Sequence, residues 1–284
     1  MNKLILVAVV VVAACQADNK NLERKIEDLN KKLDTLSAQL ARGGGAGAAP
    51  QRPARAEPDR AKTYAVPVDG DPADGPADAK VTVVKAYDYA CPFCEKVRDS
   101  MEELRKKYPS DVRVVHKQFV VHPQVATAGA LAVCAANKQG KFLQMDQLLW
   151  DKGFKARQYD KDATDGGQTQ RCWESAAGCP IILGFAQELG LNADKLKADM
   201  KGECQQLLQK DMKELQALGV SATPAFFING RYLSGAQPLD QFVLLVDEEL
   251  KKANEKIQAG MPAASYYQQV VLDKGLKQLE KPAQ

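Results

Sequence analysis

The chain has 284 residues, and its charged side chains leave a formal net charge of only +3 at neutral pH. A charge this small, without a concentrated basic patch, argues against a nucleic-acid partner. The two His and six Met residues form no tract rich in metal ligands, so paired thiolates are the one feature that would suit a copper-handling protein.

Residues 1–15 indicate an export signal. Lys3 supplies a positive start, residues 4–14 are continuously apolar, and small residues precede Cys15. This apolar run is shorter than the about 20 residues that span a bilayer as a helix. The end of the run resembles the lipobox of bacterial lipoproteins, which implies cleavage before Cys15 and a lipid anchor there. It also implies a location on the bacterial cell envelope, facing the periplasm or exterior. An ordinary signal peptide or an uncleaved anchor is the alternative.

Residues 19–41 predict a short coiled coil. Apolar residues recur at alternating spacings of four and three, with charged residues between them, and they are Leu22, Ile26, Leu29, Leu33, Leu36 and Leu40. We expect self-association through residues 22–40, as a dimer or a trimer. A lone amphipathic helix on the membrane or on its own domain is the alternative. Residues 42–62, rich in Gly and Pro, predict a flexible linker.

One domain with an insertion suits residues 63–254. We expect strands at 64–68, 81–87, 112–120, 225–228 and 231–233, helices at 95–108 and 239–253, and a helical insertion at about 123–218. The last two strands flank Asn229-Gly230, a strong signal for a hairpin. The order predicts an α/β domain, followed at 255–284 by a tail with a short helix at 264–272.

The sequence Cys91-Pro92-Phe93-Cys94 joins the end of an apolar run to the start of a predicted helix. A C-x-x-C at such a junction is typical of a thiol–disulfide redox site. Free N–H groups at the helix start favour a thiolate, and Pro92 suits the first turn because it lacks an N–H. Half a zinc site and an inert disulfide are the alternatives, but structural zinc needs four ligands and the chain has no second C-x-x-C. We therefore expect neither a metal nor a cofactor.

Four other cysteines remain: Cys134, Cys172, Cys179 and Cys204. An even number in an exported chain suggests two structural disulfides, because disulfides persist in an oxidising compartment. The short loop between Cys172 and Cys179 favours their pairing, which leaves Cys134 with Cys204. The other two connectivities stay open, as do free buried thiols.

Several motifs together resemble the DsbA-like thiol–disulfide oxidoreductases over about residues 64–254. They are Asp88-Tyr89-Ala90-Cys91-Pro92-Phe93-Cys94, His122-Pro123, Gln139-Gly140-Lys141-Phe142, the stretch 219–230 and Gly235-Ala236-Gln237. The resemblance implies a thioredoxin fold with an inserted helical subdomain. It also implies that Cys91 is the exposed nucleophile and that Cys94 resolves the mixed disulfide. By the same resemblance, Pro224 is cis rather than in an ordinary trans turn, and the backbone of Thr223 pairs with an extended substrate.

Two residues depart from that family and are expected to tune the redox pair, together with Pro92. Phe93 stands where the strongest oxidants have His, so we expect a less extreme reduction potential. Lys85 stands where relatives usually carry a buried acid, six residues before the first Cys. A cation stabilises a thiolate but is a poor substitute for a carboxylate base. Asp88 is an alternative acid, and Lys117 stands at the place of a family Lys. The alternative for Lys85 is that its ammonium simply points to solvent.

The features together predict a membrane-tethered, extracytoplasmic oxidoreductase that forms or rearranges disulfides in exported proteins. An oxidase needs a membrane redox partner that reoxidises it, whereas an isomerase or reductase keeps Cys91 reduced. The coiled segment favours an isomerase, which gains from several active sites that face one cleft, although a flexible linker would not fix such a cleft. The frequency of oxidases in the family favours an oxidase. A redox-inactive chaperone or adaptor is the alternative from another class, and the intact cysteine pair argues against it.

Overall fold

The computed structural model describes residues 24–29, 31–32, 35, 57–165 and 167–280, in two units divided after Ala54. The described residues of the first unit are helical, and Ile26 and Leu29 are 51% and 59% exposed. Cys15 and the four other leucines of the predicted coiled coil lie outside the described residues. Among the helices that are described, none is both long enough and apolar enough to cross a bilayer.

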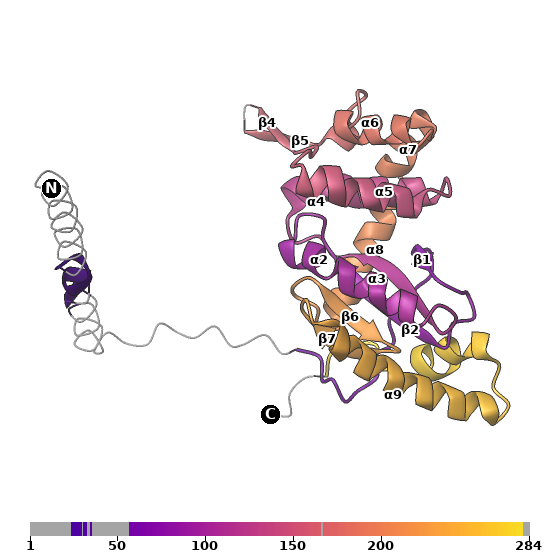
Figure 1. Ribbon diagram of the computed structural model, residues 1–284. Helices are drawn as coiled ribbons and strands as arrows, with labels where there is room; N and C mark the ends of the chain where they lie inside the picture. The colour runs from indigo at the N-terminus through magenta and orange to yellow at the C-terminus, as the bar shows by residue number, and fades with distance from the viewer. Residues whose placement is uncertain (1–23, 30, 33–34, 36–56, 166, 281–284) are drawn as a thin grey trace, which may run out of the picture. The chain divides into compact units, whose positions relative to one another are not determined.

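The second unit is built on a five-stranded sheet with the order β1-β3-β2-β6-β7 (Figure 1). The strands are β1 (Ala73–Asp74), β2 (Val81–Tyr87), β3 (Val112–Gln118), β6 (Ala225–Ile228) and β7 (Arg231–Ser234). Strand β2 runs parallel to β3 and antiparallel to β6, so it is the central strand. Every residue of β2 is buried, as its continuous Val-rich sequence predicts for a strand covered on both faces.

Helices cover both faces of this sheet. Helices α3 (Arg98–Lys107) and α9 (Leu239–Gln258) pack on one face, where Val81, Val83 and Phe226 join them in a core. Helix α8 (Glu203–Ala217) and the C-terminal turns η3 (Ala263–Ser265) and η4 (Tyr267–Leu272) lie toward the other face, whose core includes Val84, Phe227 and Leu215. The result is the thioredoxin-like α/β arrangement.

The helical insertion separates β3 from β6. It consists of α4 (Pro123–Asn137), α5 (Phe142–Leu148), the π-helical turn η1 (Leu149–Lys155), η2 (Cys172–Glu174), α6 (Pro180–Glu188), α7 (Ala193–Lys201) and α8. Helices α4 to α7 lie at one end of this unit, opposite α9 (Figure 1). Their apolar core also includes Tyr87, Tyr89, Cys91 and Cys94, so the insertion packs directly against the cysteine pair.

Three sequence-based predictions of elements need correction. Residues 64–68 form no strand, because the Tyr64 and Ala65 N–H groups bond to single carbonyls of Gly230 and Leu276 rather than to one ladder. The predicted helix 95–108 is two helices, α2 (Pro92–Lys96) and α3, that meet at Val97. The insertion is also not wholly helical, because β4 (Ala163–Asp165) and β5 (Gln168–Gln170) form a small hairpin.

A buried ionic cluster joins β3 to α8 and to the segment before β1. The Lys117 Nζ lies 2.7 Å from Asp71, 2.7 Å from Asp211 and 3.0 Å from Glu214. Burial raises the pKa of Asp71 to about 7, and the nearby Asp211 carboxylate adds to the rise. The ammonium of Lys117 thus offsets part of the cost of burying carboxylates together.

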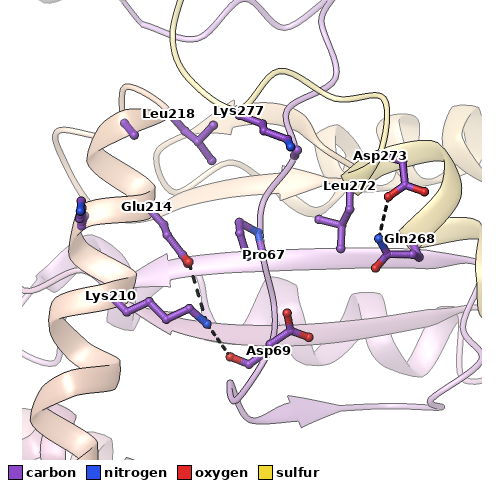
Figure 2. Close-up of a pocket in the computed structure, with 12 residues that line it drawn as sticks. Pro67, Asp69, Lys210, Glu214, Leu218, Gln268, Leu272, Asp273 and Lys277 are labelled. Carbon is purple, nitrogen blue, oxygen red and sulfur yellow. Dashed lines mark hydrogen bonds and ion pairs between the residues drawn. The ribbon is translucent and has the colours of Figure 1, made fainter.

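A hollow with a volume of about 770 Å³ lies between α8 and the C-terminal turn η4, and Glu214 of the cluster is one of the residues that line it (Figure 2). Lys210 spans it by contacting the Asp69 carbonyl and the Glu214 carboxylate, and Gln268 bonds to Asp273 on the far side. None of the residues that line this hollow belongs to the C-x-x-C or to the Thr223-Pro224 loop.

Two disulfides hold the insertion. Cys134 on α4 is bonded to Cys204 on α8, 70 residues away, and Cys172 is bonded to Cys179 across 7 residues. This is the connectivity that the short Cys172–Cys179 loop favoured, and it leaves Cys91 and Cys94 as free thiols.

We predict that the two disulfides differ in their contribution to stability. In the chain-entropy model, closing loops of these lengths stabilises a fold by about 4 kcal/mol for the long loop and about 2 kcal/mol for the short one. Urea unfolding of the Cys134→Ser/Cys204→Ser and Cys172→Ser/Cys179→Ser double variants measures this. A larger loss of unfolding free energy in the second variant would contradict the prediction.

Candidate active site

The cysteine pair lies where strand β2 passes into helix α2. Cys91 is the N-cap of α2, with Pro92 in the first turn, and its carbonyl accepts the N–H groups of Cys94 and Glu95. The side chain of Phe93 between the two cysteines is 60% exposed. Cys94 is fully buried and Cys91 is only 4% exposed, so the expected exposed nucleophile is in fact covered.

The two thiols have opposite proton affinities. A hydrogen bond with the Cys94 thiol, joined by hydrogen bonds with the backbone of Cys94 and Phe93, lowers the pKa of Cys91 to about 6 despite its burial. Burial, together with the Cys91 thiolate, raises the pKa of Cys94 far above its usual range. At neutral pH Cys91 is therefore the thiolate and Cys94 is its hydrogen-bond donor.

The loop that covers Cys91 comes from a distant part of the chain. The Thr223–Pro224 peptide bond is cis, and the Cys91 thiol, when protonated, donates to the Thr223 carbonyl over 3.3 Å. Position 223 is thus placed directly at the Cys91 sulfur. The Thr223 hydroxyl oxygen is buried and has no hydrogen-bond partner within the described residues.

Asp88 fixes the position of the redox loop. Its buried carboxylate accepts the backbone N–H groups of Ala90 at 2.6 Å, Val121 at 2.6 Å and His122 at 2.8 Å. The His122 Nδ1 lies 3.2 Å from the same carboxylate. These bonds tie the start of α2 to the start of α4, so the Asp88 carboxylate organises the backbone around the cysteine pair.

Lys85 lies inside the protein, and the reading in which its ammonium points to solvent is wrong. The residue is 3% exposed, and its Nζ lies 4.4 Å from the centre of the Tyr87 ring and 5.9 Å from that of Trp150. Burial lowers the pKa of Lys85, against the opposing attraction of Asp146 and Cys94. Lys117, in contrast, is paired in its own cluster on the other face.

Sequence reasoning missed Asp146 on α5. Its carboxylate accepts the Tyr89 hydroxyl at 2.6 Å and the Trp150 Nε1–H at 3.2 Å, and the Tyr87 and Tyr89 hydroxyls lie 3.1 Å apart. These rings belong to the same apolar core as the cysteine pair. A single Asp in a helical stretch gives no signal of this kind, because the contact spans 57 residues.

The family comparison agrees with this geometry. A family model described as thioredoxin matches residues 68–248, which is more than half of the chain. The chain belongs to the thioredoxin family. The cysteine pair, the cis Thr223–Pro224 peptide bond and all five strands of the large sheet lie within the matched residues.

Solved structures show the same fold. A thioredoxin-like oxidoreductase from Silicibacter pomeroyi DSS-3 is 26% identical, with a TM-score of 0.52, and the match covers 64% of this chain and 94% of that one. BdbD from Bacillus subtilis is 21% identical, with a TM-score of 0.55 and coverage of 69% and 100%. An alpha-DsbA1 variant from Wolbachia pipientis is 16% identical, with a TM-score of 0.53 and coverage of 68% and 96%. The DsbA-like fold with its helical insertion is thereby shown.

Curated relatives of this thioredoxin-family chain are much longer proteins. The Na⁺/H⁺ antiporter NhaA of Herminiimonas arsenicoxydans is 29% identical over 57% of this chain and 23% of its own length. The antiporter NhaA 1 of Salinispora arenicola (strain CNS-205) is 31% identical over 62% of this chain and 24% of its own length. The chain thus spans about a quarter of the length of the curated relatives that it matches. The antiporter activity in their names belongs to those proteins.

We predict that the Cys94 thiol controls the acidity of Cys91. Alkylation of the reduced protein should increase with pH around a midpoint near 6. In Cys94→Ala the midpoint should rise by more than one unit toward the about 8.5 of a free cysteine, because the largest cause of the shift is removed. In Cys94→Ser, whose hydroxyl still donates, it should rise less. The ultraviolet absorbance of the thiolate reports the same titration, and an unmoved midpoint in Cys94→Ala would refute the assignment.

Proposed function

We propose that the protein is an extracytoplasmic thiol–disulfide oxidoreductase that forms or rearranges disulfides in exported proteins. The observation that carries this is the pair of thiols with opposite proton affinities facing the Thr223-Pro224 loop. The Cys91 thiolate attacks a substrate disulfide, or the Cys91–Cys94 disulfide is attacked by a substrate thiolate. Both directions pass through a mixed disulfide at Cys91 that Cys94 resolves or forms.

A hollow next to this loop supports a protein substrate or a membrane redox partner. It has a volume of about 600 Å³, and it is lined by Phe119, Val120, Val121, Met212, Gln216, Gly219, Val220, Ser221 and Leu279. Ser221 lies two residues before Thr223, and Val121 is held by Asp88. The apolar members of this lining and the exposed Phe93 offer surface for an extended segment whose backbone pairs at Thr223.

An oxidase of moderate strength fits the site better than a very strong oxidant. The Cys91 pKa of about 6 lies closer to the about 7 of thioredoxin than to the about 3.5 of the strongest oxidants in this fold. Because the Cys91 thiolate is less stabilised than in the strongest oxidants, the reduced protein is less favoured and the protein is a weaker oxidant. The exposed Phe93 contributes no charge that would lower the pKa further. An isomerase is the second candidate, and the periodicity of residues 22–40 favours it because self-association brings several sites together.

The direction of electron flow is tested by two measurements on one preparation. We expect a reduction potential between about −120 and −270 mV, the values of a strong oxidant and of thioredoxin. We also expect oxidation of a reduced, unfolded substrate that is lost in Cys91→Ser. Refolding of a substrate with scrambled disulfides separates an isomerase from an oxidase. Equal activity of Cys91→Ser and the unchanged chain would refute the thiol mechanism. The redox-inactive chaperone or adaptor would then be the remaining alternative.

The N-terminal segment supports a tether to the cell envelope. Lipid at Cys15, followed by the helical segment and the linker, would hold the catalytic domain near a membrane. In Cys15→Ala we expect loss of lipid incorporation and a shift of the mature protein to the soluble fraction. Removal of residues 16–41 should reduce the mass in solution to that of a monomer. A monomeric mass with and without these residues would refute self-association.

A further inference from the structure

The hollow beside the Thr223-Pro224 loop borders the redox site on two sides. The Thr223 carbonyl lies 3.3 Å from the Cys91 Sγ, and Ser221, two residues earlier in the chain, lines the hollow. Val121 lines it from another segment, and its N–H donates to the Asp88 carboxylate that also holds the redox loop. Residues of an extended chain advance about 3.3 Å each. A substrate residue about two positions from the reacting cysteine is therefore within reach of the hollow.

The lining of this hollow is uncharged. Its volume is about 600 Å³, and none of the described residues that line it carries a charge. Its large apolar members are Phe119, Val120, Val121, Met212, Val220 and Leu279. A charged side chain is costly to remove from water without a partner, whereas burial of an apolar side chain is favourable. The hollow therefore favours an apolar substrate side chain over a charged one.

One wall of the hollow comes from residues 276–280, the segment that follows the C-terminal turn η4. The Leu279 N–H donates to the Ala217 carbonyl at the end of α8 over 2.8 Å. The Leu279 side chain packs on Gly219, where a Cβ atom would lie only 3.1 Å from the Leu279 Cδ2. Gly219 also has a φ of +87°, so a glycine suits both the turn and the close approach. Leu279 is therefore seated on the loop that leads to Thr223.

Bonds before and after this position hold the segment in place. The Leu276 N–H donates to the Thr63 carbonyl, and the Leu276 carbonyl accepts the Ala65 N–H, each over 2.9 Å. On the other side, Glu280 forms an ion pair with Lys62. A side chain between two such anchors needs little further ordering when a ligand binds, so less of the binding free energy is lost. The segment thus presents a preformed apolar surface to the hollow.

The segment lies outside the part of the chain that the family model matches. The match covers residues 68–248, which include the cysteine pair and the Thr223–Pro224 peptide bond. Residues 276–280, and the residues 62–65 that hold them, lie beyond the two ends of the match. This wall is therefore an addition of this chain to a site whose reacting groups belong to the shared fold.

We infer that Leu279 determines specificity, by selecting substrate proteins that carry an apolar residue about two positions from the reacting cysteine. The inference rests on the proposed function and narrows its substrate class. Leu279 acts through the substrate side chain and leaves the chemistry to Cys91 and Cys94. The rate of attack should therefore depend on the residue at position 279 only for substrates that reach the hollow.

Peptide aryl disulfides measure this selectivity. Each peptide has a single cysteine bonded to a chromogenic aryl thiol, with Leu, Glu or Lys placed next but one to it on either side. The same aryl disulfide of N-acetylcysteine amide has no neighbouring residue. The Cys91 thiolate of the reduced protein bonds to the peptide sulfur, and the aryl thiolate leaves with the electron pair and is measured by its absorbance. In the unchanged protein we expect the Leu peptide to react about tenfold faster than the Glu and Lys peptides, the lower end for an apolar pocket.

Three substitutions at position 279 change the wall in different ways. Leu279→Ala removes apolar contact, so the preference for the Leu peptide over the Glu peptide should fall by at least about threefold. Leu279→Lys and Leu279→Glu should move the ratio of the Glu-peptide rate to the Lys-peptide rate in opposite directions. Each shift should be about threefold, within the range for a partly exposed charge pair. Both shifts should shrink as salt is added.

Lys277→Glu is the matched control. Lys277 belongs to the same segment, but it lines the hollow between α8 and η4 instead (Figure 2). Reversal of its charge should therefore move the Glu-to-Lys rate ratio less than Leu279→Glu does, and a larger shift would overturn the assignment. The reaction of the N-acetylcysteine compound and the titration midpoint of Cys91 should be the same in all variants, because neither involves the hollow.

Failure of the inference differs from failure of the proposed function. If the unchanged protein releases the aryl thiolate no faster than Cys91→Ser, the proposed function itself is overturned. If it reacts but the three variants at position 279 keep its peptide ratios, the role of Leu279 alone is overturned. The same holds if those variants slow every compound in proportion, the N-acetylcysteine compound included, since that marks a merely structural role. Thermal unfolding shows that the variants compared are folded.

Discussion

The central position of strand β2 is the constraint on which the site depends. Because β3 and β6 flank it and helices cover both faces, every side chain of β2 is buried. Alternation then sends Val81, Val83 and Lys85 toward the α3 side, whether or not a residue is charged. The same strand ends next to Asp88 and the redox loop, so one element fixes both the buried amine and the start of helix α2.

A second consequence of this arrangement is that three distant segments converge on one sulfur. The redox loop, the start of α4 and the Thr223-Pro224 loop meet around Cys91, and the buried Asp88 carboxylate satisfies three backbone N–H groups at that meeting point. Buried backbone donors without partners are costly. The carboxylate therefore holds the geometry of the loop that carries the Cys91 thiol.

The insertion contributes to the chemistry as well as to the fold. Its α5 and η1 supply Asp146 and Trp150, which are hydrogen-bonded to each other, and its core includes both Cys91 and Cys94. The Cys134–Cys204 disulfide closes this part of the molecule on α8, whose Asp211 and Glu214 in turn bind Lys117. The environment of the second thiol is thus set by residues outside the sheet.

Local patterns determined much of this protein from the sequence alone. The C-x-x-C at a strand–helix junction, the Asn229-Gly230 hairpin and the Val-rich β2 are contiguous signals, and they give the thioredoxin-like order of elements. Spacing also indicated the pairing of Cys172 with Cys179. The strand at 64–68 was wrong because strand character needs a neighbour with a free ladder edge, which periodicity cannot show.

Only the tertiary structure decided the surroundings of the Cys91-Cys94 pair. The burial of Lys85, the role of Asp88 as an acceptor for backbone groups and the presence of Asp146 all depend on contacts between residues far apart in the chain. Asp146 contacts Tyr89 across 57 residues, and Cys91 contacts Thr223 across 132. The sequence specifies which groups are present and which local elements carry them. Proton affinities follow from burial and from neighbouring charges, and these exist only once the chain has folded.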